Sequence, residues 1–175
     1  MYRSSQMNSV NNSYAVKQST HGVIPFKINK LWPELKPADG GARLVMVRGL
    51  PGSGKTTVAS VLKLLGYQHF EADMFFVGND GVYRHDSSRI GEAHTWCQSS
   101  VKAALDRGER VVVCNTFTRL KEIEPYLAMT SDVQVLEAGG RWRNQHGVPL
   151  EKISAMRARW EPLPSSYKCG RWSAP

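Results

Sequence analysis

Cysteine is scarce in this sequence, and its spacing argues against two kinds of framework. The three cysteines are Cys97, Cys114 and Cys169, an odd number in which no two form a C-x-x-C pair. A disulfide scaffold needs paired cysteines and a structural zinc site needs closely spaced ligands, so neither is expected. A reducing, cytoplasmic compartment is the simplest expectation for such a chain.

Long apolar runs are also missing. No segment of the sequence approaches the ~20 consecutive apolar residues that span a bilayer. No apolar stretch follows the first residues, which argues against a secretory signal. We therefore expect no membrane partner.

Acidic residues are outnumbered by basic ones. Asp and Glu total 15 against 23 Lys and Arg, which leaves a formal net charge of +8 at pH 7. This excess of positive charge favours a polyanionic partner, of which nucleic acid is the first candidate. On charge alone, a soluble surface that is merely basic is an equal alternative.

One segment, residues 49–57, matches the phosphate-binding pattern G-x-x-x-x-G-K-[ST] without a gap. Its glycines let the backbone curl so that N–H groups point at phosphate oxygens. Lys55 would add a cation for the β- and γ-phosphates of ATP, and Thr56 a hydroxyl for Mg²⁺. The predicted nucleotide-binding residues are Gly49, Pro51, Gly52, Ser53, Gly54, Lys55, Thr56 and Thr57. A glycine-rich turn that binds nothing is the weaker interpretation, because a strand and a helix flank the motif as a P-loop requires.

The composition divides the chain into three parts. Residues 1–40 are rich in Ser, Asn and Gln and then in proline, which predicts a flexible N-terminal arm. Residues 41–162 are predicted to form a P-loop domain and residues 163–175 a C-terminal tail. Within the domain, apolar patterns predict strands over 44–47, 68–72, 110–114 and 132–136, and helices over 57–65, 90–105, 120–129 and 150–160. This alternation predicts an α/β fold of the P-loop NTPase type, a parallel sheet flanked by helices on both faces.

Asp73 is the candidate catalytic base. Ligands of such sheets bind at the carboxyl ends of the strands, and Asp73 directly follows the second predicted strand. Its carboxylate is expected to overlook the γ-phosphate, where it would accept the proton of an attacking hydroxyl. The alternative is an N-cap for a helix from Met74 onward, and we favour catalysis.

The metal site is less complete. Many P-loop enzymes end an apolar strand with aspartate, whereas residues 111–113 are followed here by Cys114 and Asn115. A thiol is a poor ligand for Mg²⁺, which prefers oxygen. We therefore expect Thr56 and Asp73, with water and the nucleotide, to hold the metal, and Asn115 to orient the acceptor or a water.

Residues 141–149 have the composition of a closing lid. Arg141, Arg143 and a histidine lie between glycines, shortly before a helix that carries two more arginines. A mobile backbone with planar, forked cations suits a segment that closes over phosphate oxygens. A solvated basic loop that never meets ATP is the alternative. We favour the lid, with Arg141 binding the nucleotide.

Taken together, several short motifs in this order resemble a known group. They are GLPGSGKT at 49–56, ADMFF at 72–76, YR at 83–84, AHTW at 93–96, NTF at 115–117, PY at 125–126 and NQHGVP at 144–149. The set resembles the P-loop kinases related to phage polynucleotide kinase, especially the branch of eukaryotic polynucleotide-kinase-like domains, over residues 43 to about 161. The P-loop is shared by many NTPases, but the ordered set is much more specific.

The resemblance implies an ATP- and Mg²⁺-dependent kinase. It implies that Lys55 and Thr56 bind phosphates and metal, that Asp73 is the hydroxyl-activating base, and that Arg143 is a catalytic lid arginine. The branch often has Asp at the position of Cys114, which leaves the metal shell open. A phosphatase or ligase domain does not fit into 175 residues, so a stand-alone kinase module is expected.

A second related group consists of small phage kinases that phosphorylate the hydroxymethyl group of hydroxymethyluracil in DNA. That role would place the chain in the host cytoplasm and require a base to be reached or flipped, with aromatic side chains near the acceptor. The aromatic residues available for this are Phe75, Phe76, Tyr83 and Trp142.

Three functions therefore stay open. The motifs favour a kinase that acts on a nucleic-acid hydroxyl, either a 5′ end or a hydroxymethylated base, with DNA ahead of RNA. The alternatives are a kinase for a nucleoside, sugar or antibiotic, and a non-catalytic nucleotide-binding switch. The oligomeric state is not predicted.

Overall fold

The computed structural model describes residues 41–142, 147–167 and 169–172, the last of these as backbone only. The predicted arm, residues 1–40, lies outside the described residues, and so does Arg143 with the three residues that follow it. The elements are β1 (Leu44–Arg48), α2 (Lys55–Leu64), β2 (Gln68–Phe70), the 3-10 turns η1 (Ala72–Phe76) and η2 (Ser87–Arg89), α3 (Ile90–Asp106), β3 (Val111–Asn115), α4 (Leu120–Leu127), β4 (Val133–Ala138), α5 (Leu150–Ala158) and β5 (Cys169–Trp172).

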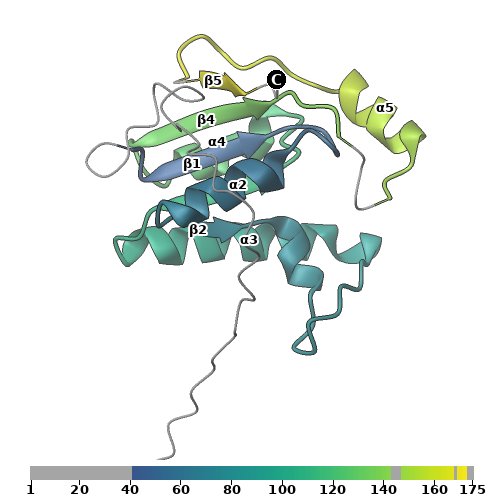
Figure 1. The fold of residues 1–175 in the computed structure, drawn as a ribbon, viewed down its shortest axis with the longest axis horizontal. Coiled ribbons are helices and arrows are strands. Elements are labelled where there is room, and N and C mark those ends of the chain that lie inside the picture. Colours follow the sequence, from purple (N-terminus) through teal and green to yellow (C-terminus); the bar gives the residue numbers. More distant parts are fainter. Residues whose placement is uncertain (1–40, 143–146, 168, 173–175) are drawn as a thin grey trace, which may run out of the picture. The chain divides into compact units, whose positions relative to one another are not determined.

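The strands form one parallel sheet in the order β2-β3-β1-β4-β5. In the central strand β1, Leu44 lies opposite Val111 of β3 and Val133 of β4. Every residue of β1 and β3 is buried, as strands covered on both faces require. All strands therefore end at one edge, which we call the carboxyl edge. In Figure 1 the strand arrows point toward the side where α5 lies.

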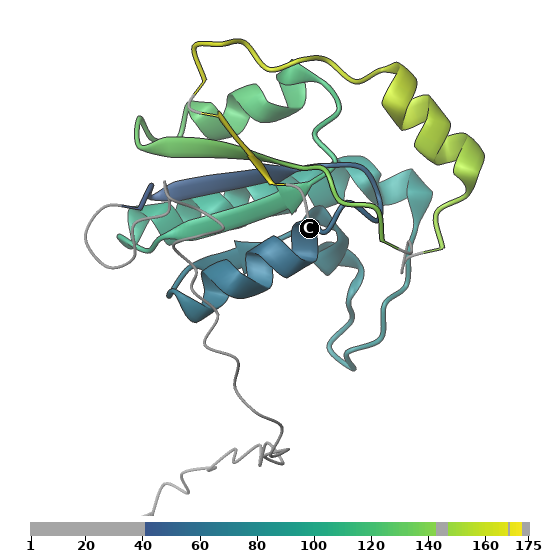
Figure 2. The same ribbon diagram turned by 45° about the horizontal axis from the view of Figure 1, so that its top comes forward.

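Helices cover both faces of the sheet, as predicted. Leu44, Met46, Val111 and Val113 share one core cluster with buried residues of α3 and α4. Because successive side chains of a strand point to opposite faces, the intervening residues face α2. The buried residues of α2 are Val58, Ala59 and Leu62. Figures 1 and 2 show α2 on one side of the strands and α4 on the other.

Two strands differ from the prediction. β5 pairs with β4, although the residues of β5 lie in the segment predicted to be a tail. A short edge strand is held by backbone hydrogen bonds and needs no long apolar pattern, so no signal in the sequence predicted β5. β2 ends at Phe70, and the chain then enters η1 instead of continuing as a strand to residue 72. This second difference determines where Asp73 lies. None of the described helices is both long and apolar enough to cross a membrane.

Candidate active site at the carboxyl edge

The P-loop connects β1 to α2 and has the backbone of a phosphate cradle. Gly52 (φ 77°) and Gly54 (φ 90°) adopt left-handed conformations that favour glycine. Gly54 is the N-cap of α2, and the first turn of that helix contains no acidic residue. The first N–H groups of a helix have no intrahelical acceptor, so this end of α2 presents donors and a positive dipole to an anion.

The interior of the cradle is small and polar. The Ser53 N–H and the Lys55 ammonium both donate to the Leu50 carbonyl oxygen, at 3.0 and 3.1 Å. The Ser53 hydroxyl is buried, and it has no hydrogen-bond partner within the described part of the chain. A Cβ at Gly49 would overlap that hydroxyl and approach the Ala138 carbonyl oxygen. A chain of phosphate oxygens fits this set of donors. The other predicted binding residues, Pro51, Thr56 and Thr57, lie in the same loop and first turn.

The segment after β4 is tied to the P-loop, which no motif had indicated. The Gly140 N–H donates to Ser53 O (3.1 Å), and the Trp142 N–H donates to Gly52 O (2.8 Å). A Cβ at Gly140 would overlap the Trp142 ring, so any larger residue there would force that ring to move. The base of the predicted lid is thus fixed against the loop that it is expected to cover.

A cavity of about 440 Å³ opens between these two segments. Its lining consists of Leu50, Pro51, Gly52, Ser53, Glu137, Ala138, Gly139, Gly140, Arg141, Trp142, Ile153, Arg157 and Trp160. Arg141 therefore lies beside the P-loop, as its predicted role requires, and its side chain is exposed. Arg143 lies outside the described residues, so its role stays a prediction.

Lys55 lies among acidic groups. Burial lowers the pKa of the Lys55 ammonium, while Cys114, Glu71 and Asp73 act in the opposite direction. Both carboxylates are therefore close enough for their charges to act on Lys55. The predicted phosphate-binding lysine and the predicted base thus lie in one electrostatic neighbourhood.

Asp73 lies in the first turn of η1, and its side chain is exposed. The N-cap position of η1 is held by Glu71, so the interpretation of Asp73 as an N-cap is wrong. Asp73 also acts on Tyr83, whose pKa is raised by burial and further by this carboxylate. Its exposure and its position next to Lys55 leave Asp73 available to an incoming hydroxyl.

Asn115 has a different task from the one expected. It is buried, its Oδ1 accepts a hydrogen bond from the Ala72 N–H (3.0 Å), and its Nδ2 lies 3.8 Å from Cys97 Sγ. These contacts engage both ends of the amide within the protein interior. Asn115 holds the first residue of η1 and so positions Asp73.

A partly buried trio near Lys55 was missed by the sequence reasoning. The ligand atoms of His69, Glu71 and Cys114 all lie within 4.8 Å of one another, and His69 Nε2 is 2.8 Å from Glu71 Oε1. Burial raises the pKa of the Cys114 thiol well above its usual value, which favours the protonated form. A protonated thiol is no ligand for Mg²⁺, but the Thr56 hydroxyl and the Asp73 carboxylate are oxygen donors that fit this ion.

Aromatic residues gather beside Asp73. The rings of Phe76 and Tyr83 pack edge to face (6.3 Å), and the rings of Tyr83 and His85 stack at 6.3 Å and 22°. Tyr83 keeps 43% of its surface exposed. The segment is held as a short hairpin by a bridge between Val77 and Tyr83.

Comparison with known proteins identifies the family. The family model described as AAA domain (AAA_33) matches residues 44–163, more than half of the chain. The chain belongs to this family. NEDD4-binding protein 2 of Homo sapiens is 33% identical over 138 residues, which cover 69% of this chain. The chain spans only 8% of the length of that protein.

Solved structures share the fold of this AAA domain. A sugar kinase from Janibacter sp. HTCC2649 matches with a TM-score of 0.59 at 20% identity, covering 75% of this chain and 85% of that one. A gluconokinase from Sinorhizobium meliloti 1021 matches with a TM-score of 0.54 at 15% identity, covering 76% and 82%. The chain therefore has a kinase-like P-loop fold.

Proposed function

We propose that this protein is an ATP-dependent kinase that transfers the γ-phosphate of ATP to a hydroxyl group of a nucleic acid. The observation that carries the proposal is the juxtaposition of Lys55 and Asp73. Lys55 at the start of α2 and the exposed Asp73 in the first turn of η1 both follow strands that end at the same edge of the sheet, and the Asp73 carboxylate opposes the lowering of the Lys55 pKa by burial. Phosphoryl transfer needs a cation on the phosphate and a base on the acceptor in this relation.

Each group has a part in the transfer. The P-loop N–H groups and Lys55 bind the phosphate oxygens, and Asp73 accepts the proton of the attacking hydroxyl. The acceptor oxygen forms a bond to the γ-phosphorus as the bond from that phosphorus to the β–γ bridging oxygen breaks, and ADP leaves with the bonding electrons. Mg²⁺ held by Thr56 and Asp73 would neutralise charge on the β- and γ-phosphates. Arg141 and Arg143 would close over the same oxygens.

Charge and aromatic surface favour a nucleic acid as the acceptor. The net charge of +8 exceeds the needs of one triphosphate. The exposed rings of Tyr83 and His85, packed on the buried Phe76 beside Asp73, offer an aromatic surface on which a base can stack. A 5′-hydroxyl end and the hydroxymethyl group of hydroxymethyluracil are the two acceptors proposed, the second in line with the resemblance to phage DNA kinases.

A small-molecule kinase is the second candidate. The sugar kinase and the gluconokinase that share the fold favour it, because the same cradle and base serve a sugar hydroxyl equally well. A net charge of +8 is the observation against it.

The test is transfer of radiolabelled γ-phosphate from ATP to a panel of acceptors. The panel contains 5′-hydroxyl DNA, 5′-hydroxyl RNA, hydroxymethyluracil DNA, a nucleoside and gluconate. We expect label on a nucleic acid with the wild type and a loss of label with Asp73→Asn. Label on gluconate or the nucleoside alone would establish the second candidate. ATP binding without transfer to any acceptor would favour a nucleotide-binding switch.

A further inference from the structure

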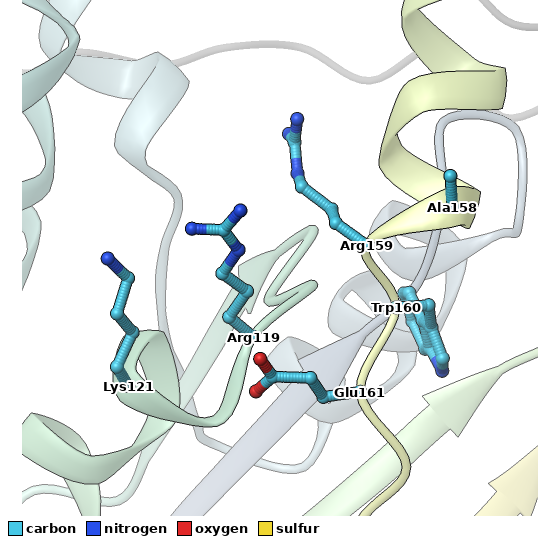
Figure 3. A pocket seen from close by; sticks show the side chains of 6 residues that line it. All are labelled: Arg119, Lys121, Ala158, Arg159, Trp160 and Glu161. Carbon is cyan, nitrogen blue, oxygen red and sulfur yellow. The ribbon is translucent and has the colours of Figure 1, made fainter.

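A second cavity lies next to the P-loop cavity. It measures about 430 Å³ and is lined by Arg119, Lys121, Ala158, Arg159, Trp160 and Glu161. Trp160 lines both cavities. We call the set Arg119, Lys121, Arg159 and Trp160 the basic pocket. It brings together the start of α4 and the segment that follows α5 (Figure 3).

The cations of the basic pocket extend toward the same space. Figure 3 shows Arg119 and Lys121 rising from the α4 side and Arg159 rising beside them from the end of α5. All three side chains are exposed. Among the ion pairs found in the described part of the chain, none involves these three residues.

Nearby carboxylates are occupied by other donors. The Glu161 carboxylate accepts a hydrogen bond from the Leu120 N–H (2.6 Å). The Glu122 carboxylate accepts bonds from the Arg119 N–H (3.3 Å) and from the Thr118 hydroxyl (3.4 Å). The pocket therefore keeps an excess of positive charge in front of these anchored carboxylates.

The wall of the pocket is fixed to the P-loop. The Arg48 guanidinium lies 3.8 Å from the centre of the Trp160 ring, and it donates to the Glu161 carbonyl oxygen (2.9 Å). Arg48 is fully buried and directly precedes Gly49 of the P-loop. Arg159 Nε donates to the Thr118 hydroxyl (3.1 Å), which ties the far end of α5 to the loop after β3. The basic pocket is thus held at a set distance from the phosphate cradle.

We propose that the basic pocket binds the phosphodiester backbone of the acceptor strand, beyond the nucleotide whose hydroxyl reacts. The inference rests on the proposed function and names the surface along which the acceptor is held. Two arginines and a lysine suit consecutive phosphates, because guanidinium groups bind phosphate oxygens in a bidentate way. The Trp160 ring adds an aromatic surface between this site and the P-loop cavity.

The first test measures binding of a fluorescent 5′-hydroxyl oligonucleotide by anisotropy over a range of salt concentrations. The wild type, Arg119→Ala, Arg159→Ala and Lys63→Ala are compared. Lys63 is exposed and lies in the last turn of α2, at the edge of the sheet opposite the P-loop. Lys63→Ala therefore removes one positive charge, as each arginine variant does, but leaves the basic pocket intact. We expect each arginine variant to bind about tenfold more weakly, with a salt slope smaller by about 1, and Lys63→Ala to bind like the wild type.

The second test separates the pocket from the reaction. KM is measured for an oligonucleotide of about 20 residues and for a nucleoside 3′-phosphate, which has one phosphate in place of a chain of phosphodiesters. The arginine variants should raise KM for the long acceptor about tenfold more than for the short one, and Arg119→Lys should recover part of that loss. Equal changes in both KM values, or wild-type DNA binding by the arginine variants, would contradict the proposal that the basic pocket binds the acceptor strand. The proposed kinase activity would not be affected by that result. Failure of all transfer to nucleic acid, with binding still lost in the arginine variants, would overturn the proposed function and leave the pocket standing.

Discussion

The two sides of the P-loop carry opposite chemistry. On the side of η1, the carboxylates Glu71 and Asp73 act on Lys55, and the aromatic surface follows directly. On the side of α5, the cavities are lined by arginines, including Arg141 and Arg159. A triphosphate bound in the loop would lie between a base for the acceptor and cations for the anions.

This separation has a kinetic consequence. The carboxylate base acts in the chemical step, whereas the arginines hold anions in the bound state. Loss of Asp73 or of the amide that positions it should therefore act mainly on kcat, whereas changes in the aromatic surface or on the α5 side should act mainly on binding. Four substitutions, from the largest expected effect to the smallest, test this division.

Asp73→Asn should lower kcat by about 10²–10⁴-fold, because the amide cannot accept the proton of the attacking hydroxyl. Binding of ATP and DNA should remain. Asp106→Asn is the control, since Asp106 pairs with Lys102 at the far end of α3 and loses the same charge. Steady-state transfer assays and anisotropy measure the two properties. An unchanged kcat would remove Asp73 from the reaction.

Gly140→Ala should lower kcat/KM for ATP by on the order of 10²-fold, because the new methyl overlaps the Trp142 ring, and refitting that ring shifts the backbone N–H that donates to Gly52 O. Gly91→Ala on α3 adds the same methyl in open space and should leave ATP use unchanged. ATP titrations of both variants make the comparison. Similar kinetics for the two would show that the segment after β4 does not position the nucleotide.

Asn115→Ala should lower kcat about tenfold and the free energy of unfolding by about 1–3 kcal/mol, because the Ala72 N–H loses its buried acceptor. The role is one of positioning, so the kinetic loss should shrink when Asp73 is already Asn. Urea unfolding and a double-mutant cycle measure both effects. Losses in kcat that simply add would mean that Asn115 acts independently of Asp73.

Tyr83→Ala should weaken DNA binding about fivefold, the lower end of what one base stacked on one ring contributes. Tyr83→Phe retains the ring and should bind DNA like the wild type. Anisotropy with single-stranded DNA is the measurement. If the phenylalanine variant binds as weakly as the alanine variant, the hydroxyl rather than the ring is responsible.

The sequence predicted the parts of the fold that depend on local patterns. The apolar runs of β1 and β3, the glycines of the P-loop and the pattern that predicts a helix over 57–65 are local signals, and they identified the elements correctly. Asp73 was predicted to overlook the γ-phosphate because the topology of a parallel sheet brings strand ends together, and its role as the base stays a prediction.

What the sequence could not predict depends on contacts between distant segments. The amide of Asn115 bonds a backbone group 43 positions away, and Arg159 bonds a hydroxyl 41 positions away. The stack of Arg48 on Trp160 likewise requires the course of the chain after α5 to be known. β5 has too few residues for a periodic pattern and forms by hydrogen bonding to the edge of β4.

The most direct test of the account is one acceptor titration carried out on Asp73→Asn and on the Arg119→Ala/Arg159→Ala double variant, with saturating ATP and a 5′-hydroxyl or hydroxymethyluracil oligonucleotide. The account predicts that Asp73→Asn has a much lower kcat and an unchanged KM for the acceptor. The double variant should have a higher KM for the acceptor and a nearly unchanged kcat. An Asp73→Asn enzyme that transfers phosphate at the wild-type rate would contradict it.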